Sequence, residues 1–143
     1  RKEYKILSPE EIVTKLKKLI KKIEDIFESC TEDVGFSHAQ FRVIFPIIKD
    51  KKGYSIQELS ELVGVDKAFV SRTIADLESK GITQRDKKTG SKERNYKIIL
   101  SEEGQKIIKE TMKKRRPAID EGIANISEEE LFNFIETLCK LTK

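Results

Sequence analysis

Apolar residues recur every three or four positions along most of the chain, which is the spacing of helices that bury one face. Two short stretches of this kind follow one another between residues 55 and 81. The first opens with Ser55 and Glu58, which form a capping box, and it ends at Gly64, a residue suited to a left-handed turn. Asp66 caps the second stretch and Gly81 stops it. The pattern predicts two helices joined by a tight turn.

The second helix is predicted to bury Val70, Ile74 and Leu77. At about 100° per residue, its opposite face then consists of small and polar residues with one arginine. The residues of that outward face and its flanks are Lys67, Ala68, Phe69, Ser71, Arg72, Ala75 and Asp76. Small residues allow a helix backbone to approach the major groove of DNA, and the polar ones supply hydrogen bonds to base edges.

Three side chains of this outward face have specific chemistry. Arg72 can donate two hydrogen bonds to one guanine, and Ser71 can serve a base or a phosphate. Phe69 has two interpretations, contact with a thymine methyl group or packing against the preceding helix. An ordinary helical hairpin with a solvated face is the alternative for the pair. Both caps, the glycine turn and the segment that follows favour a helix-turn-helix that reads duplex DNA.

A basic hairpin follows the two helices. Residues 82–86 and 95–100 are predicted strands, with Tyr96, Ile98 and Leu100 on one side of the second strand and residues 95, 97 and 99 on the other. The glycine-containing tip between them is basic, and its candidate contacts to DNA are Lys87, Lys88, Lys92 and Arg94. A charge run alone is more often a solvated loop. After a helix-turn-helix, it is better explained as a wing that contacts phosphates and the minor groove.

The stretch from Leu59 to Gly104 resembles the MarR family of winged-helix regulators. The landmarks are Asp76-Leu-Glu-Ser-Lys-Gly-Ile82, Arg85-Asp86 at the entry to the wing, and Ile99-Leu-Ser-Glu-Glu-Gly104 at its exit. The resemblance implies that Arg94 takes the role of the family's wing arginine, which reaches into the minor groove. Lys92 stands where the family usually has an aspartate, and the wing is one residue longer. This departure makes the wing more basic and should raise nonspecific affinity for phosphate.

Long helices are predicted before and after this winged helix-turn-helix segment. Ser8, Ser37, Ser101 and Ser127 each precede an apolar stripe at helical spacing and are predicted caps. Two prolines fall inside predicted helices: we expect Pro46 to kink or shorten its helix, and Pro117 to bend or restart the helix that begins after the wing. The first helix and the last two carry more apolar surface than the small lobe can cover. The resemblance implies that these helices intertwine into a homodimer.

The predicted fold class is mainly α with a small β-hairpin wing (α+β). Residues 1–143 are expected to form a single domain, in which residues 37–100 are the winged helix-turn-helix lobe and residues 8–30 and 101–143 are the dimerisation helices. Two recognition helices related by a twofold axis would meet half-sites about 34 Å apart on a pseudo-palindromic DNA. The sequence therefore indicates a transcriptional regulator, expected to be a ligand-responsive repressor, with double-stranded DNA and a second copy of itself as partners.

Regulation of DNA binding in such a dimer requires a ligand or a modification that changes the spacing of the two lobes. The resemblance implies a small aromatic or phenolic effector, or oxidation of a cysteine. We hypothesise an effector pocket between the dimerisation helices and the lobe, near Phe36, His38, Phe41 and Phe45; plain core aromatics are the alternative. Cys30 lies among acidic residues and Cys139 lies beside Lys140, so neither has the surroundings of a sensing thiol near the start of the first helix.

Composition and the absence of certain motifs argue against a membrane protein, a secreted protein and an enzyme. The formal net charge is only +4, and it matters because the excess is concentrated in the wing. No apolar run approaches the roughly 20 residues of a membrane span and no signal-peptide pattern opens the chain, so we expect a cytoplasmic protein with no membrane partner. His38 is the single histidine, and phosphate-loop, zinc-protease and hydrolase motifs are absent from the sequence. We expect no enzymatic activity, cofactor or metal.

Two alternatives to a ligand-responsive DNA-binding regulator stay open at this point. The slightly acidic recognition helix is compatible with a winged-helix module that binds proteins instead of DNA. A regulator that senses oxidation through one of its two cysteines is the other.

Overall fold

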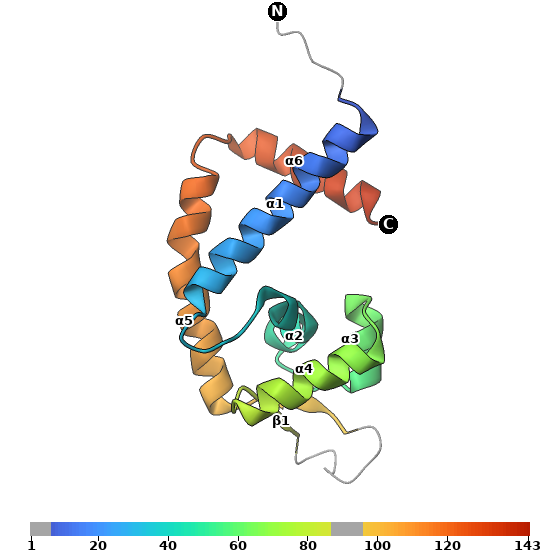
Figure 1. The fold of residues 1–143 in the computed structure, drawn as a ribbon, viewed down its shortest axis with the longest axis vertical. Helices are drawn as coiled ribbons and strands as arrows, with labels where there is room; N and C mark the ends of the chain where they lie inside the picture. Colours follow the sequence, from blue (N-terminus) through green and yellow to red (C-terminus); the bar gives the residue numbers. More distant parts are fainter. Residues whose placement is uncertain (1–6, 87–95) are drawn as a thin grey trace, which may run out of the picture.

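The structure is a computed structural model, and it describes residues 7–86 and 96–143. The described residues form six helices and a two-stranded sheet, in the order α1 (Pro9–Cys30), α2 (His38–Asp50), α3 (Ile56–Val63), α4 (Lys67–Ser79), β1 (Thr83–Arg85), β2 (Ile98–Leu100), α5 (Glu102–Gly122) and α6 (Glu128–Leu141). A lower lobe contains α2, α3, α4 and the sheet, α5 rises along one side, and α1 and α6 lie above (Figure 1). The predicted fold class is confirmed.

Every helix begins at a residue whose side chain accepts a hydrogen bond from the first turn. Full capping boxes are present at Ser8, Ser37, Ser55 and Ser127, while Asp66 and Ser101 cap α4 and α5. The turn glycines behave as predicted, because Gly64 has φ 77° and Gly81 has φ 75°. These local signals therefore set the helix boundaries, with α4 ending at Ser79.

Both internal prolines lie inside helices that continue through them. Pro46 was expected to kink or shorten its helix; it does not shorten it, since α2 runs to Asp50. Pro117 does not restart its helix either, because α5 is a single element from Glu102 to Gly122. A proline removes one backbone hydrogen bond of the helix. In α2 the buried side chains of Ile44 and Ile47, one on each side of Pro46, keep the helix packed on the core despite that loss.

The strands of the wing are shorter than predicted. β1 and β2 pair antiparallel, with Thr83 opposite Leu100 and Arg85 opposite Ile98. Residues 82, 86, 96 and 97 lie outside the strands, and residue 95 falls outside the described part of the chain. The sequence reading also missed Tyr54, which forms an isolated bridge to Ile98 through hydrogen bonds of 3.1 and 2.8 Å. β2 therefore has a backbone partner on each side, β1 on one and Tyr54 on the other. The bridge to Tyr54 connects the wing to the segment between α2 and α3.

The hydrophobic core lies in the lower lobe and at its junction with α1 and α5. Its largest fully buried members are Phe27, Phe36, Ile44, Ile47, Leu59, Leu77, Ile82 and Ile98. The predicted stripe of α3 is only partly buried, because Leu59 is inaccessible while Leu62 is 62% exposed. The predicted buried face of α4 is confirmed, with Thr73 as an additional buried member.

The start of α5 rests directly on the backbone of Ile82, in the short segment between α4 and β1. The Ser101 amide donates to the Ile82 carbonyl at 3.1 Å, and the Gly104 amide donates to Ser101 Oγ at 2.8 Å. A Cβ atom on Gly104 would lie 2.0 Å from the Ile82 carbonyl oxygen. Only glycine leaves room for this approach, which fixes the position of α5 against the wing lobe.

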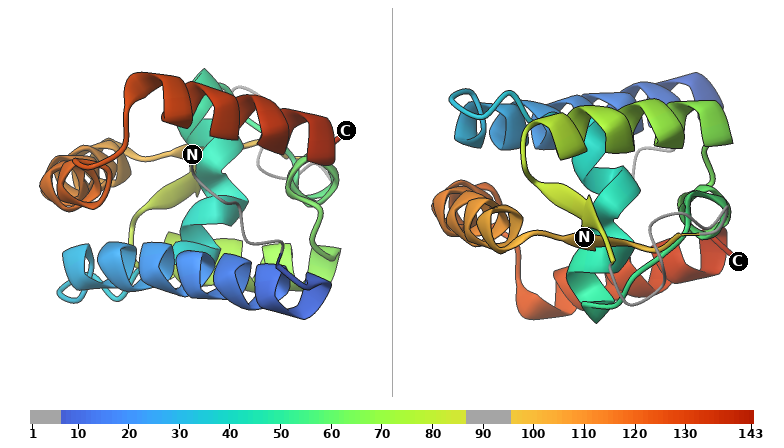
Figure 2. Two further views of the ribbon diagram at one scale, coloured as in Figure 1. Left: turned by 90° about the horizontal axis from the view of Figure 1, so that it is seen from above. Right: turned by 90° about the horizontal axis from the view of Figure 1, so that it is seen from below.

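The upper helices leave large apolar faces uncovered in the single chain. α1 exposes Ile12, Val13, Leu16, Leu19, Ile20 and Ile23, and α6 exposes Phe132, Phe134, Ile135, Leu138 and Leu141. The two helices cross in Figure 1, but the view from above in Figure 2 shows them on opposite sides, so neither covers the other. No helix in the described part of the chain is long and apolar enough to cross a membrane.

Candidate nucleic-acid interface

The outward face of α4 is exposed as its helical spacing predicts. Lys67, Ala68, Ser71, Arg72 and Ala75 are all exposed. The opposite face is anchored, because Val70 and Leu77 are fully buried and Ile74 is 4% exposed. Phe69 is half-buried and packs against the core, which favours the packing interpretation over contact with a base. α4 therefore presents small side chains, one hydroxyl and one guanidinium from a rigid support.

The turn between α3 and α4 is held by its own polar contacts. Gly64 adopts the left-handed conformation at the end of α3, and Ser60 Oγ donates to the Val65 carbonyl at 2.5 Å. The Asp66 side chain then accepts from the Phe69 amide at 2.8 Å and starts α4. This arrangement of two helices joined by a short glycine turn is the helix-turn-helix.

The base of the wing is connected to the lobe by charged side chains. Lys97 forms an ion pair with Glu58, the residue that completes the capping box of α3. This ion pair, together with the Ser55 amide, lowers the pKa of Glu58. The Arg85 guanidinium lies over the Tyr96 ring, 4.0 Å from its centroid. The predicted contact residues Lys87, Lys88, Lys92 and Arg94 lie outside the described residues.

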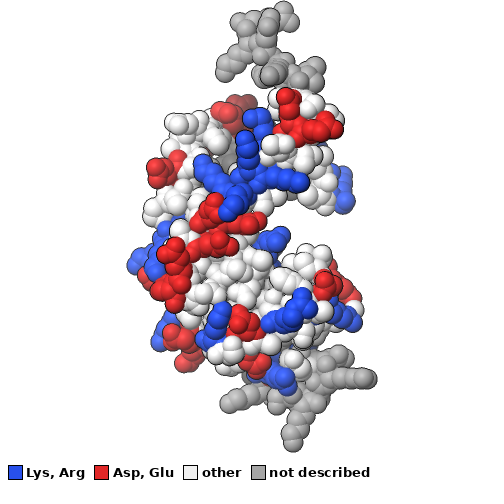
Figure 3. All heavy atoms as spheres, in the orientation of Figure 1, with Lys and Arg blue, Asp and Glu red and all other residues white. Residues whose placement is uncertain are grey.

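Charge alone does not single out the binding surface on the face that Figure 3 shows. Basic and acidic side chains lie beside one another over the lower lobe in that view. The argument for a DNA-reading face therefore rests on the shape and exposure of α4.

Two of the four aromatic residues of the predicted effector pocket belong to the hydrophobic core. Phe36 and Phe41 are 2% and 5% exposed and belong to the core, while Phe45 is 48% exposed on α2. His38 is half-buried, with its ring 5.3 Å from that of Phe27. Burial, and then the charge of Arg42, lowers the pKa of His38, which disfavours protonation of its imidazole. This geometry favours the core interpretation for Phe36 and Phe41.

A groove lies elsewhere, between the end of α2, strand β2 and the start of α5. Its volume is about 420 Å³, and its lining residues are Ile47, Ile48, Lys51, Ile99, Leu100, Gln105, Ile108 and Lys109. We call it the α2–α5 groove. The sequence held one signal for it: Ile99 is an apolar residue on the side of its strand that otherwise carries polar residues.

The two cysteines do not form a pair. Cys30 is half-buried at the end of α1 and lines a second, shallow cavity with Asp33 and Glu110, whereas Cys139 is exposed on α6. Within residues 7–86 and 96–143, no cluster of His, Cys, Asp and Glu side chains is placed to hold a metal ion.

Comparison with known proteins points to one family of regulators. The family model described as "MarR family" matches residues 36–93. The HTH-type transcriptional regulator YdgJ of Bacillus subtilis (strain 168) is 29% identical over 131 residues, which cover 92% of this chain and 77% of that protein. The chain is thus similar to MarR-family regulators, most specifically over its helix-turn-helix lobe. Proteins of this family are transcriptional regulators that bind DNA and act as dimers, so the expectations of a DNA-binding regulator and of a non-enzyme are confirmed at that level.

Solved structures of MarR-family regulators share this fold along most of their length. The MarR protein of Peptoclostridium difficile superposes with a TM-score of 0.80 at 18% identity, covering 99% of this chain and 93% of its own. The organohalide-sensing regulator RdhR, in its 2,4-dichlorophenol-bound form, superposes with a TM-score of 0.78 at 18% identity, covering 99% of this chain and 83% of its own. At such identities the likeness concerns the fold and not individual contacts.

Proposed function

We propose that this chain reads a pseudo-palindromic operator as a twofold homodimer, with α4 in the major groove and the wing in the adjacent minor groove. The observation that carries this proposal is the division of α4 into a buried face and an exposed face of small residues around Ser71 and Arg72. A helix anchored in this way can approach base edges without losing its packing on the core.

The contacts divide into two kinds. Ser71 and Arg72 read bases, while Ala68 and Ala75 allow the backbone of α4 to come close. Lys67, at the first turn of α4, contacts a phosphate. The wing residues Lys87, Lys88, Lys92 and Arg94 supply phosphate and minor-groove contacts that do not depend on sequence.

The dimer is built from the helices outside the lobe. Residues 37–100 form the DNA-binding unit, and residues 8–30 and 101–143 provide the interface. The exposed apolar faces of α1 and α6 support this division, because a second copy is the partner that would remove both from water at once. With twofold symmetry, the two α4 helices meet half-sites about 34 Å apart.

The direct test is fluorescence anisotropy of labelled duplexes across a salt series. We expect binding that weakens steeply with salt, and a preferred duplex recovered from a random pool. Arg72→Ala should relax the preference at one base position by about 1–3 kcal/mol, whereas Arg94→Ala should weaken binding to all sequences alike.

Lys49→Ala is the matched control, since it removes one positive charge from an exposed position on α2 outside the proposed interface. It should change the affinity for the preferred and the scrambled duplex equally and slightly. An absence of salt-dependent binding at low ionic strength would contradict the proposal and favour the protein-interaction module.

We further propose that a small aromatic or phenolic effector controls DNA binding from the α2–α5 groove. The lining of the groove is mostly aliphatic and includes Lys51 and Lys109, which suits a molecule with an apolar ring and an acidic hydroxyl. RdhR, which has a similar fold, has a 2,4-dichlorophenol-bound form.

Titration of the DNA complex with 2,4-dichlorophenol tests the effector. We expect release of the duplex, and Ile48→Phe should raise the phenol concentration needed at least tenfold because the larger ring fills the groove. Phe45→Leu, on the exposed side of the same helix, should leave the titration unchanged. Equal titrations for the two variants would place the phenol elsewhere.

A further inference from the structure

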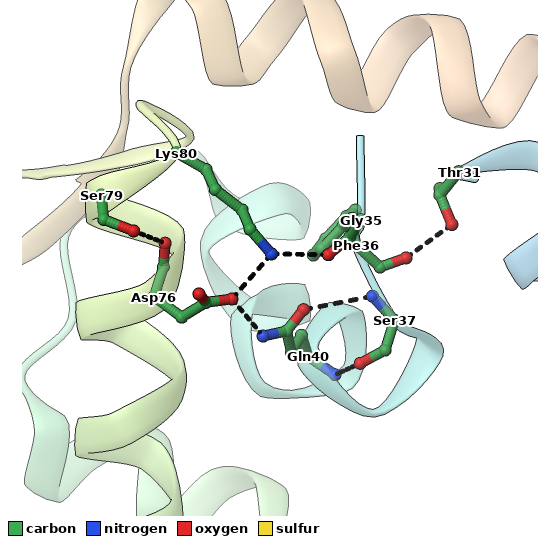
Figure 4. A network of polar contacts seen from close by, with 8 residues as sticks. All are labelled: Thr31, Gly35, Phe36, Ser37, Gln40, Asp76, Ser79 and Lys80. Atoms are coloured by element: carbon green, nitrogen blue, oxygen red, sulfur yellow. Dashed lines mark hydrogen bonds and ion pairs between the residues drawn. The ribbon is translucent and has the colours of Figure 1, made fainter. Parts of the chain in front are cut away.

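A bridge of polar side chains joins α4 to α2 and to the loop that follows α1 (Figure 4). The Asp76 carboxylate is its centre. One carboxylate oxygen, Oδ2, accepts from Gln40 Nε2 at 2.7 Å and from Lys80 Nζ at 2.9 Å. Lys80 Nζ also donates to the Gly35 carbonyl at 2.6 Å. Asp76 and Lys80 at the end of α4 therefore hold two points of the stretch from Gly35 to Gln40, which lies about 40 positions away in sequence.

The Gln40 side chain is oriented for this contact by the capping box of α2. Its Oε1 accepts from the Ser37 amide at 3.1 Å, and the Gln40 amide donates to Ser37 Oγ at 3.1 Å. Because the amide oxygen is committed to Ser37, the amide nitrogen must face the other way, toward Asp76. A local signal that starts α2 thus also orients a contact to α4.

The loop that receives Lys80 is itself fixed to the end of α1. Thr31 caps α1 and is 2% exposed, and its Oγ1 donates to the Phe36 carbonyl at 2.5 Å. The Gly35 amide donates to the Thr31 carbonyl at 2.9 Å. Lys80 therefore reaches a rigid stretch of backbone, and the bridge continues from α4 to the helix that carries the exposed apolar face.

The bridge lies in register with the base-reading side chain. Arg72, Asp76 and Lys80 are spaced four residues apart, so they follow one another along one side of α4. The apolar contacts of Val70, Ile74 and Leu77 hold α4 on the core, but such contacts have little directional preference. Hydrogen bonds are directional. The bridge is thus the contact suited to fix the rotation of α4 about its own axis.

We propose that Asp76, Gln40 and Lys80 are positioning residues for DNA recognition, which set the rotation of α4 and couple it to the end of α1. This inference rests on the proposed function, because it assumes that Arg72 reads a base. Without the bridge, the buried face of α4 still packs on the core, Arg72 keeps its charge, and the wing still contacts phosphates. The loss therefore falls on discrimination between sequences, and not on general affinity for DNA.

The experiment compares dissociation constants for the duplex selected by the wild-type protein and for a scrambled duplex. We expect Asp76→Ala to lower the ratio of the two at least tenfold, with the affinity for the scrambled duplex unchanged or slightly higher. Lys80→Met should have a similar effect, and the double variant should be no worse than either single one, since both remove the same bridge. If the bridge contributed only to stability, these variants would have a lower Tm, but the folded protein would keep the wild-type ratio of dissociation constants.

Glu78→Ala is the matched control, because it removes the same charge from an exposed position two residues further along α4. Its ratio should stay within twofold of the wild type. If Asp76→Ala and Lys80→Met, both folded by circular dichroism, keep the wild-type ratio, the inference is wrong while the proposed function stands. If the wild-type protein itself shows no preferred duplex, both are wrong.

Discussion

Leu16→Asp and Ile135→Asp are expected to convert the protein to a monomer and to weaken specific DNA binding at least 100-fold. Leu16 lies in the exposed stripe of α1 and is 45% exposed in the single chain, and Ile135 lies on α6 and is 51% exposed. Twofold symmetry repeats each substitution, so either variant places two carboxylates in the proposed interface. An unpaired buried carboxylate costs several kcal/mol, enough to dissociate a dimer of ordinary affinity.

DNA binding weakens because a monomer has only one winged helix-turn-helix lobe. Two linked lobes bind two half-sites with an avidity about 10² to 10⁴ times that of one lobe. Thr14→Asp is the matched control, because it puts the same charge on the opposite side of α1. Light scattering gives the mass and anisotropy gives the affinity. A Leu16→Asp variant that stays dimeric and binds DNA would contradict the proposed interface.

Gly104→Ala is expected to destabilise the fold by about 2–4 kcal/mol, which is large for the addition of one methyl group. The added Cβ would lie 2.0 Å from the Ile82 carbonyl oxygen, and that atom belongs to the backbone. The overlap can be relieved only by moving α5 away from the segment between α4 and β1. The same movement would break the hydrogen bond from the Ser101 amide to the Ile82 carbonyl.

Chemical denaturation at one fixed protein concentration measures this effect, since the stability of a dimer depends on concentration. Gly122→Ala is the control in the same helix, because a Cβ there meets no atom within 4 Å. Alanine has the higher helix propensity, so that variant should be neutral or slightly stabilised. Equal stabilities for the two variants would contradict the close approach at Gly104.

Local sequence signals predicted the helices of the winged helix-turn-helix lobe well, because each signal acts within one helical turn. A serine or aspartate that accepts a hydrogen bond three residues ahead, as at Ser55 and Asp66, closes a turn whatever lies around it. Gly64 reverses the chain through a conformation that few other residues adopt. The same short range explains why the exposed face of α4 followed from its helical spacing alone.

The errors concern features that depend on distant parts of the chain. Pro46 does not end α2, because burial of the residues around it outweighs one lost hydrogen bond. Tyr54 joins the sheet through Ile98, a partner 44 positions away that no local pattern identifies. The α2–α5 groove likewise exists only where two helices and a strand fail to fill the space between them.

Residue patterns along the chain were enough to predict the helices, the turn, the fold class and the residues that face outward from α4, since helical periodicity and caps are local properties. Which of those residues are held in place, and by what contacts, could be seen only in the folded chain. The meeting of Gln40, Asp76 and Lys80, and the contact of Gly104 with the backbone of Ile82, depend on how separate elements pack. Packing is a property of the whole chain, because each such contact requires every element between its partners to be in position.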